Sequence, residues 1–371
     1  MNQKLKVMID VSAVPYGRGV SRYTSNLVKH LGLRQDLEVT AFGYSQGQFG
    51  QLRQWAKTLP KQVRPKLWRI SPSLLGKMWR VFGGPSPVNH TTQVFHAWDW
   101  QLAPVKTPQV VTIHDLAYKL FPETAHPVVA AHYNQLIAQL EKETDIQVIT
   151  VSQTSKNDIV RLTKIATDRV HVVYQSLPEE AEVVPQQSDL DEVTQKYSLT
   201  KPFLLFVGTT EPRKNLKNII RAWEQVKGEF DLVIAGAAGW DDFKLQPGMQ
   251  VLGYVSSLEL AALYRVAHVL VFPSLYEGFG LPILEAYFHG CPVITSNVSS
   301  MKEIAGKPAI LVDPNSFDEI AEAIQAVEAK DSRARRKRIQ DMTEVLQEFR
   351  WEKTAAQTAQ VYQIAAGEKK Q

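Results

Sequence analysis

Short runs of apolar residues alternate with longer amphipathic stretches along most of this 371-residue chain. The short runs are almost wholly apolar, which is typical of strands that are buried on both faces in a parallel sheet. The longer stretches place apolar residues three and four apart, as in Leu216, Ile219 and Trp223, and this spacing predicts helices. The pattern therefore predicts an α/β fold whose parallel sheets are covered by helices on both faces.

The predicted strands fall into two groups. In the first half of the chain they are Leu5–Val11, Glu38–Gly43, Val94–Trp98, Val110–Ile113, Ile146–Val151 and Val170–Val173. In the second half they are Phe203–Val207, Leu232–Ala235, Val251–Gly253, Val269–Phe272, Val293–Thr295 and Ile310–Val312. Helical patterns fill most of the intervals, so each group is expected to form its own sheet.

A polar, proline-bearing segment separates the two groups of strands. It runs from Leu177 to Thr200 and contains a cluster of acidic residues, a composition typical of a link between domains. A chain of 371 residues is long for one hydrophobic core and natural for two. We therefore expect an N-terminal domain over residues 1–178 and a C-terminal domain over residues 179–350.

Two glutamates bracket a glycine-rich loop in the segment YEGFGLPILE, between a predicted strand and a predicted helix. Gly278 and Gly280 let the backbone approach a ligand or adopt positive φ, and Pro282 is favoured in a first helical turn. Free amides at a helix start attract anions, while the carboxylates of Glu277 and Glu285 accept hydrogen bonds from hydroxyl groups. Surface glutamates at this spacing are common, but the loop around them favours a nucleotide-sugar site.

A second strand–loop–helix segment lies upstream, in FLLFVGTTEPRKNL. Gly208 directly follows the strand, and Arg213 and Lys214 stand near the start of the next helix. Ligands of open α/β sheets bind at the carboxyl ends of the strands. Two cations at such a place can neutralise a pyrophosphate, although an exposed basic pair on a surface loop has the same sequence.

The N-terminal half offers further candidate ligand-binding residues. Gly17 and Gly19 follow the first strand and open a helix, where a phosphate or sugar can approach the backbone. The third glycine of a dinucleotide-binding fingerprint is absent, which argues against a dehydrogenase. His114, followed by Asp115, ends another strand and is a candidate base or sugar ligand, although such a pair is often structural.

The chain resembles retaining glycosyltransferases of family 4 from Phe203 to about Pro314. The strings that carry the resemblance are VGTTEPRKNL, DLVIAGAAGW, VLGYVSSLELAALYRVA, VFPSLYEGFGLPILEAYFHGCPVITSNVSSMKEIAG and ILVDP. The N-terminal half matches more loosely, through VMIDVSAVPYGRGVSRYTSNLV and VVTIHDLAYKLFPE. This resemblance implies a GT-B fold of two Rossmann-like domains, with the donor on the C-terminal domain and the acceptor mainly on the N-terminal one. It also implies that the helix at 351–371 packs back on the N-terminal domain.

The resemblance further implies a role for each candidate residue. Glu285 would hold the ribose hydroxyls of a nucleotide-diphosphate sugar. Glu277 would hold the sugar together with the loop amides of Gly278, Phe279, Gly280 and Leu281, and Gly17, Gly19 and Gly208 would also bind the donor. Arg213 and Lys214 would stabilise the departing diphosphate, and His114 would stabilise an oxocarbenium-like state. No metal or cofactor is expected, because no metal-binding acidic motif is apparent.

Composition and charge limit the classes of protein to which this chain can belong. At 44% hydrophobic and 22% charged residues the chain is typical of soluble globular proteins. Its single cysteine, Cys291, excludes an internal disulfide and suits a reducing compartment, so we expect a cytoplasmic protein. A formal charge of +4 is too small to indicate a nucleic-acid partner. A second basic run, Arg333 to Arg338, is expected to be the solvated face of a helix.

Positive charge is concentrated in one part of the N-terminal half. Between Val39 and Trp98 the chain has no Asp or Glu, and residues 53–82 mix lysines and arginines with tryptophans. Such a mixture suits an anionic membrane surface, including the inner face of the plasma membrane, and equally suits a solvated basic face with core aromatics.

The favoured function is transfer of mannose or a related hexose to a glycan or lipid-linked acceptor, in bacterial polysaccharide assembly. A nucleotide-sugar epimerase on the same fold and a non-catalytic membrane- or glycan-binding protein remain as alternatives.

Overall fold

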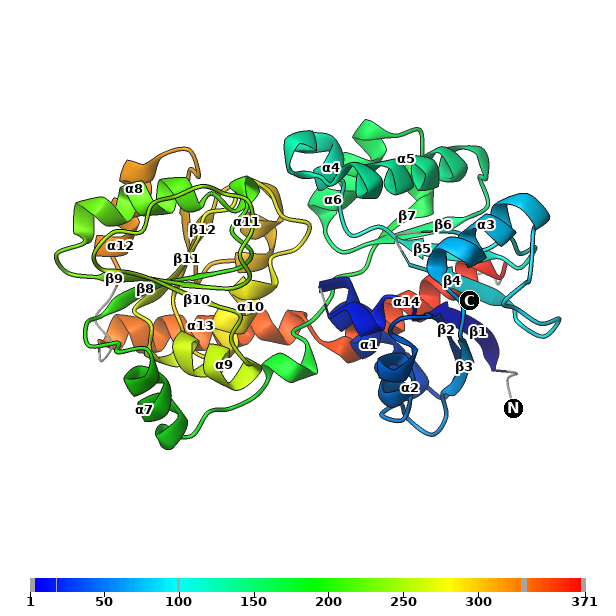
Figure 1. The fold of residues 1–371 in the computed structure, drawn as a ribbon, viewed down its shortest axis with the longest axis horizontal. Helices are drawn as coiled ribbons and strands as arrows, with labels where there is room; N and C mark the ends of the chain where they lie inside the picture. Colours follow the sequence, from blue (N-terminus) through cyan, green and yellow to red (C-terminus); the bar gives the residue numbers. More distant parts are fainter. Residues whose placement is uncertain (1–3, 18, 99–100, 328–331, 368–371) are drawn as a thin grey trace. The chain divides into compact units, whose positions relative to one another are not determined.

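Figure 1 shows a computed structural model of the chain, which describes residues 4–17, 19–98, 101–327 and 332–367. The chain divides into two compact units. The first comprises the described parts of Met1–Leu116, Ala125–Gln175 and Trp351–Gln371, and the second those of Ala117–Thr124 and Ser176–Arg350. Each unit is built around a parallel sheet of its own, as the alternation of strand and helix patterns predicts.

The first unit contains a seven-stranded sheet in the order β3-β2-β1-β4-β5-β6-β7. All neighbouring pairs in this sheet are parallel, so the carboxyl ends of its strands share one edge. The strands are β1 (Leu5–Asp10), β2 (Leu37–Tyr44), β3 (Arg64–Trp68), β4 (Val94–Ala97), β5 (Gln109–Thr112), β6 (Gln147–Thr150) and β7 (Val170–Val172).

Helices connect these strands. They are α1 (Gly19–Gly32), α2 (Phe49–Ala56), α3 (Pro72–Phe82), α5 (Pro127–Lys142) and α6 (Gln153–Leu162), with α14 (Trp351–Ala365) arriving from the end of the chain. The short α4 (Ala117–Leu120) groups with the second unit.

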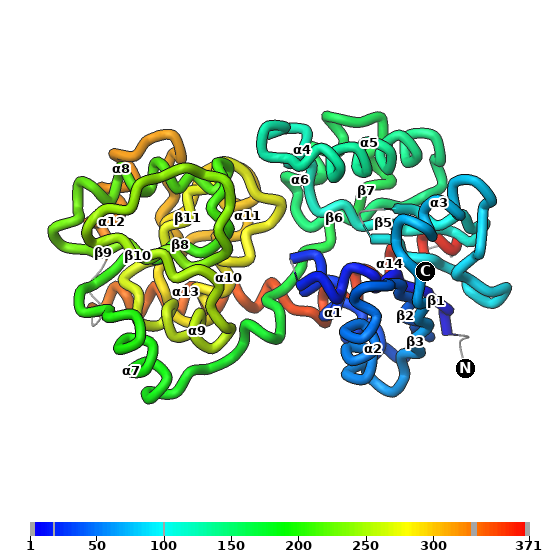
Figure 2. Tube along the Cα trace, viewed as in Figure 1, coloured from blue at the N-terminus to red at the C-terminus, as the bar shows by residue number. Residues whose placement is uncertain are grey.

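The last helix, α14, packs against α1 in the first unit (Figure 2). Its Tyr362 is fully buried, and the hydroxyl lies 2.7 Å from Nδ1 of His96 in β4. The other ring nitrogen of His96 lies 2.8 Å from the hydroxyl of Thr112 in β5. Burial, with a smaller effect of His114, lowers the pKa of His96 to about 3, so a neutral imidazole links α14 to the sheet.

The second unit contains a six-stranded parallel sheet in the order β10-β9-β8-β11-β12-β13. Its strands are β8 (Phe203–Val207), β9 (Asp231–Ala235), β10 (Met249–Gly253), β11 (Val269–Phe272), β12 (Val293–Ser296) and β13 (Ile310–Val312). The helices are α7 (Gln187–Lys196), α8 (Leu216–Val226), α9 (Ser257–Val266), α10 (Leu281–Phe288), α11 (Ser299–Ala305), α12 (Phe317–Gln325) and α13 (Arg333–Glu348).

Each face of the second sheet has its own hydrophobic core. Leu204 and Phe206 of β8 point to the face covered by α8 and α12, where Trp223 is fully buried. Leu205 points to the opposite face, which α9, α10 and α13 cover. This alternation follows from the two-residue period of a strand, and Cys291 lies in the second of these cores as a buried free thiol.

Two sequence-based expectations are wrong in detail. Strand β3 was not predicted, because Arg64–Trp68 contains a proline between two basic residues and lies at the exposed edge of its sheet. The run from Arg333 to Arg338 is not simply a solvated face. Arg335 is buried and donates to the carbonyl of His268 at 3.2 Å, and Arg338 donates to the carbonyl of Pro308. Both side chains therefore hold α13 against the sheet.

Candidate active site

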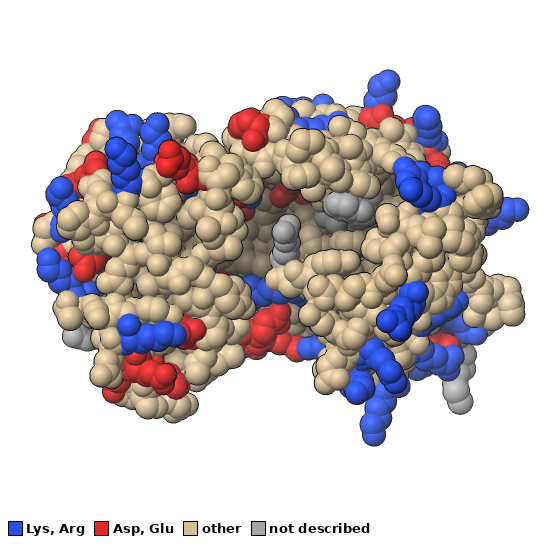
Figure 3. All heavy atoms as spheres, in the orientation of Figure 1, with Lys and Arg blue, Asp and Glu red and all other residues tan. Residues whose placement is uncertain are grey.

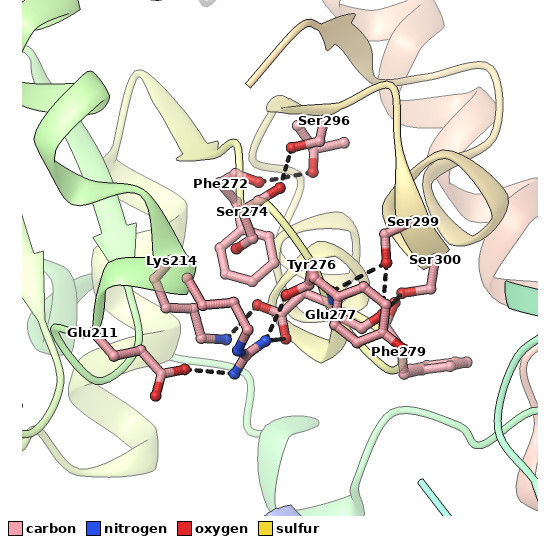
Figure 4. A network of polar contacts seen from close by, with 12 residues as sticks. Glu211, Lys214, Phe272, Ser274, Tyr276, Glu277, Phe279, Ser296, Ser299 and Ser300 are labelled. Atoms are coloured by element: carbon pink, nitrogen blue, oxygen red, sulfur yellow. Dashed lines mark hydrogen bonds and ion pairs between the residues drawn. The ribbon is translucent and has the colours of Figure 1, made fainter. Parts of the chain in front are cut away.

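The central candidate residues of the second unit come from loops after two neighbouring strands. Arg213 and Lys214 lie in a short 3-10 helix, Pro212–Lys214, that follows β8. Glu277 lies in the loop that follows β11, the strand paired with β8. Because these parallel strands end at one edge of the sheet, their loops bring the three side chains together (Figure 4).

Direct contacts join this group, which we call the ion cluster (Arg213, Lys214, Glu277 and Glu211). Nζ of Lys214 lies 2.5 Å from Oε1 of Glu277, and Nη1 of Arg213 lies 3.1 Å from Oε2. The same guanidinium donates to Glu211 at 2.5 Å and to the carbonyl of Tyr276 at 2.5 Å. Arg213 is thereby fixed by groups on both loops, and its position is set before any ligand binds.

The electrostatics of Glu277 follow from these contacts. Burial by itself would raise the pKa of Glu277, but the charges of Lys214 and Arg213 outweigh burial and lower the pKa to about 2. The carboxylate therefore stays ionised throughout the neutral pH range. An ionised, largely buried carboxylate is a strong acceptor for the hydroxyl groups of a sugar.

Serines behind the loop hold the backbone of Glu277 in place. The hydroxyl of Ser299 accepts from the amide of Glu277 at 3.2 Å, and it donates to the carbonyl of the same residue at 2.9 Å. Ser300 donates to the carbonyls of Glu277 and Phe279 at 2.7 and 2.9 Å. Neither serine was predicted from the sequence, where the only signal is their place at the start of the helix that follows β12.

Asn215 is a further supporting residue that was not predicted from the sequence. It is buried, has φ 63°, and ends the short helix that carries Arg213 and Lys214. Its amide donates to the carbonyl of Pro273 at 2.9 Å and to that of Pro314 at 2.6 Å. One side chain thus ties the loop after β8 to the loops after β11 and β13, and the left-handed backbone position suits asparagine.

Glycines bring the loop after β9 against the loop after β8. A Cβ at Gly236, which has φ +143°, would lie 2.2 Å from the carbonyl oxygen of Gly208. A Cβ at Gly239 would lie 2.0 Å from the carbonyl oxygen of Thr210. The amide of Gly239 also donates to the hydroxyl of Thr210 at 2.8 Å. Gly208 itself has φ +147°, so this part of the predicted site depends on glycine at several positions.

The loop between the two glutamates enters α10 through a glycine. Gly280 has φ 110° and precedes the first helical residue, Leu281. The side chain of Phe279 is buried and contacts Phe349 edge to face, with ring centroids 5.7 Å apart. The side chain of Phe279 therefore anchors the loop, while the backbone of residues 278–281 remains the candidate sugar-binding element.

Glu285 lies in α10, as the helical pattern predicts, and it is buried. The hydroxyl of Tyr264 in α9 donates to its Oε2 at 3.0 Å. The structure therefore brings Glu277, Arg213 and Lys214 into contact and places Glu285 on the adjoining helix.

The remaining candidates lie in the first unit. Gly17 has φ 65° and Gly19 begins α1, and neither would bring a Cβ within 4 Å of another group. His114 follows β5 and packs edge to face on Tyr23 of α1, with ring centroids 4.8 Å apart. Gly17, Gly19 and His114 thus lie at the start of α1 and at the carboxyl edge of the first sheet.

A buried carboxyl group shares a small pocket with His114. Asp10 ends β1, and its Oδ1 accepts from the amide of Ser12 at 2.8 Å. Burial raises the pKa of Asp10 to about 7, although hydrogen bonds with Ser12 act in the opposite direction. The sequence analysis missed Asp10, for which the available signal is an acid at the end of the apolar run VMID.

Two protein-family models together span most of the chain. The model described as Glycosyltransferase Family 4 matches residues 17–180, and the model described as Glycosyl transferases group 1 matches residues 189–344. The chain belongs to the group 1 glycosyltransferases. The predicted family is thereby confirmed, and the ion cluster lies within the part that the group 1 model matches.

Two relatives of this glycosyltransferase are O-antigen chain mannosyltransferases by name. O-antigen chain mannosyltransferase B of Escherichia coli is 27% identical over 97% of this chain and 100% of its own length. O-antigen chain mannosyltransferase RfbU of Salmonella typhimurium is 26% identical over 72% of each chain.

Solved structures share the fold of this glycosyltransferase at low sequence identity. Sucrose-phosphate synthase from Thermosynechococcus elongatus has a TM-score of 0.74 at 19% identity, over 99% of this chain and 100% of its own. HepE from Anabaena, solved with UDP and glucose, has a TM-score of 0.72 at 16% identity, over 96% and 98%. These likenesses confirm the predicted GT-B fold.

Proposed function

We propose that this glycosyltransferase is a retaining enzyme that transfers mannose from a nucleotide-diphosphate donor to a glycan or lipid-linked acceptor in polysaccharide assembly. The observation that carries the proposal is the ion cluster, in which two cations and a carboxylate meet at the carboxyl edge of the second sheet. The mannosyltransferase activity of both O-antigen relatives supports mannose as the sugar.

Groups of opposite charge in the ion cluster would bind different parts of the donor. Lys214 has three N–H donors, and Glu277 takes one of them at 2.5 Å. The remaining donors of Lys214, with the guanidinium of Arg213, would neutralise the charge that grows on the diphosphate as it leaves. Preorganised charges of this kind commonly supply the largest share of rate acceleration.

Glu277 and the loop amides would hold the sugar. The carboxylate stays ionised because its pKa is about 2, so it accepts from sugar hydroxyls at any working pH. The amides of residues 278–281 are positioned by Ser300 and by the left-handed backbone of Gly280. Glu285 would hold the ribose of the nucleotide.

The donor and the reaction are tested together. The full-length protein is screened by thermal shift against GDP-mannose, UDP-glucose and UDP-N-acetylglucosamine, and the stabilising donor is incubated with and without a mannoside acceptor. We expect stabilisation by GDP-mannose and an α-linked product only when acceptor is present. Conversion of the donor sugar without acceptor would identify an epimerase instead, and the absence of both donor binding and product would reject the proposal.

We also propose that α3 meets an anionic membrane surface. Of the tryptophans in residues 53–82, Trp79 is buried, so the aromatics of this segment partly serve the core. Val81 and Phe82 at the end of α3, however, are 70% and 80% exposed. Lysine and arginine side chains gather over α2 and β3 of the same unit (Figure 3), and β3 leads into α3 along the chain. In the described residues no helix has the length and apolar character needed to cross a membrane.

A vesicle assay tests this surface. Replacing both Val81 and Phe82 by serine should lower binding to phosphatidylglycerol vesicles at least tenfold, since each apolar side chain contributes about 1.5–3 kcal/mol when fully buried. Tyr254→Ser, at a side chain that is 88% exposed in the second unit, is the matched control and should bind as the wild type. Equal binding of all three proteins in a sedimentation assay would contradict the assignment.

A further inference from the structure

A pocket in the first unit lies between α3 and α5, and none of the candidate donor-binding residues lines it. Its volume is about 250 Å³, close to the lower end of the range for small-ligand sites. Along the chain, α3 follows β3 and α5 follows β5 of the first sheet. Gln101, which also lines the pocket, lies in the segment after β4. The polar side chains that line it are Ser73, Arg80, Gln101, His132, Gln135 and Gln139.

The chemistry of this lining favours uncharged hydroxyl groups. Each of the three glutamines presents an amide that both donates and accepts, as a hydroxyl group does. Arg80 is the only charged side chain among the lining residues that the structure describes, and no carboxylate is among them. The pocket therefore differs from the ion cluster, where opposite charges suit a diphosphate.

Two apolar residues also line the pocket. They are Leu136 of α5, which is buried, and Pro72 at the start of α3, which is exposed. A hexose presents C–H groups on one face of its ring and hydroxyl groups around its edge. A lining that combines amides with apolar side chains offers partners for both parts of such a ligand.

Close packing fixes one of the amides. A Cβ at Gly76 would lie 3.1 Å from Oε1 and 3.5 Å from Nε2 of Gln101, so glycine lets this amide rest directly on the backbone of α3. Nε of Arg80 donates to the carbonyl of Gly76 at 3.2 Å, which holds the guanidinium along the same helix. The side chains of Gln101 and Arg80 are thus both positioned by the backbone of α3 at Gly76.

We propose that this pocket is a subsite for neutral hexose units of the acceptor chain, separate from the unit that receives the transferred sugar. The inference rests on the proposed function, because it assigns the acceptor of that reaction. The pocket lies in the first unit, between helices that follow β3 and β5, and His114 lies at the end of β5 in the same unit. The enzyme then prefers acceptors of several sugar units over a monosaccharide.

Acceptor length provides the test. Transfer from GDP-mannose is measured with methyl α-mannoside and with an α-linked mannotetraose, and the wild type should show a KM at least tenfold lower for the tetrasaccharide. Replacing Gln101 and Gln139 together by alanine should abolish this difference while kcat and the donor KM change less than twofold. Ser73→Trp, which fills the pocket from its rim, should have the same effect.

Controls separate the subsite from the function and from folding. Gln54→Ala, at an exposed glutamine of α2 that does not line the pocket, should retain the preference for the tetrasaccharide. Saturation-transfer NMR of mannotetraose in the absence of donor reports binding even where no transfer occurs. Absence of transfer by the wild type from every donor would reject the proposed function. Active variants with an unchanged preference for the longer acceptor, and unchanged binding in the NMR experiment, would overturn the subsite.

Discussion

Replacing Lys214 by alanine should lower the turnover of sugar transfer at least a hundredfold while the protein stays folded. The expected loss matches the roughly 2.7–4 kcal/mol measured when one preorganised group is removed from a site of developing negative charge. The fold should persist because Nη1 of Arg213 still lies 3.1 Å from Glu277, so the buried carboxylate keeps a cationic partner. Loss of both partners would be far more costly.

Steady-state kinetics and thermal unfolding together measure this effect. The melting temperature of Lys214→Ala should fall by only a few degrees. In the wild type the pKa of Glu277 is about 2, so this carboxylate is ionised in an assay between pH 6 and pH 8. In the variant the charge of Arg213 still acts to lower the pKa of Glu277 against the effect of burial. Lys217→Ala, at an exposed lysine of the next helix, is the control and should keep full turnover. A Lys214→Ala enzyme with more than a third of wild-type turnover would remove this residue from the proposed mechanism.

The buried strands of this protein were predictable because they are continuous apolar runs. Phe203–Val207, Val269–Phe272 and Ile310–Val312 were predicted to the residue. Strand β3 was missed because it lies at the edge of its sheet, where a strand can carry a proline and basic residues. Pro65 and its basic neighbours therefore give no continuous apolar run. Sequence patterns therefore reveal strands to the extent that they are buried.

The candidate site divides in a similar way. Arg213, Lys214 and Glu277 were identifiable because charged residues beside glycine loops follow apolar strands, and their meeting requires only that β8 and β11 be neighbours. The supporting residues were not identifiable. Asn215 and Ser300 are ordinary polar residues in the sequence, and their hydrogen bonds reach across 58 and 23 positions of the chain. Those partners are defined only once the sheet has formed.

Substituting Gly236 by alanine should destabilise the second unit by on the order of 3–5 kcal/mol and weaken donor binding in parallel. The new Cβ would lie 2.2 Å from the carbonyl oxygen of Gly208, a backbone atom that cannot rotate away, and φ +143° is itself unfavourable for alanine. Relief of this clash requires the loop after β8 to move. That loop leads directly to Arg213 and Lys214, so a local steric change should disturb the ion cluster.

Denaturant unfolding and binding of the donor measure the two consequences. Gly228→Ala is the matched control, because a Cβ there meets nothing within 4 Å and its φ lies outside the left-handed range. This control should be neutral or slightly stabilising, since alanine restricts the unfolded chain. If Gly236→Ala matched the control in both stability and donor affinity, the loop contact would have no role in holding the cations. The clash predicts that Gly236→Ala binds the donor more weakly even without denaturant, where the variant is fully folded. If the variant bound the donor more weakly only at denaturant concentrations that partly unfold it, the substitution would affect stability and not the position of the cations.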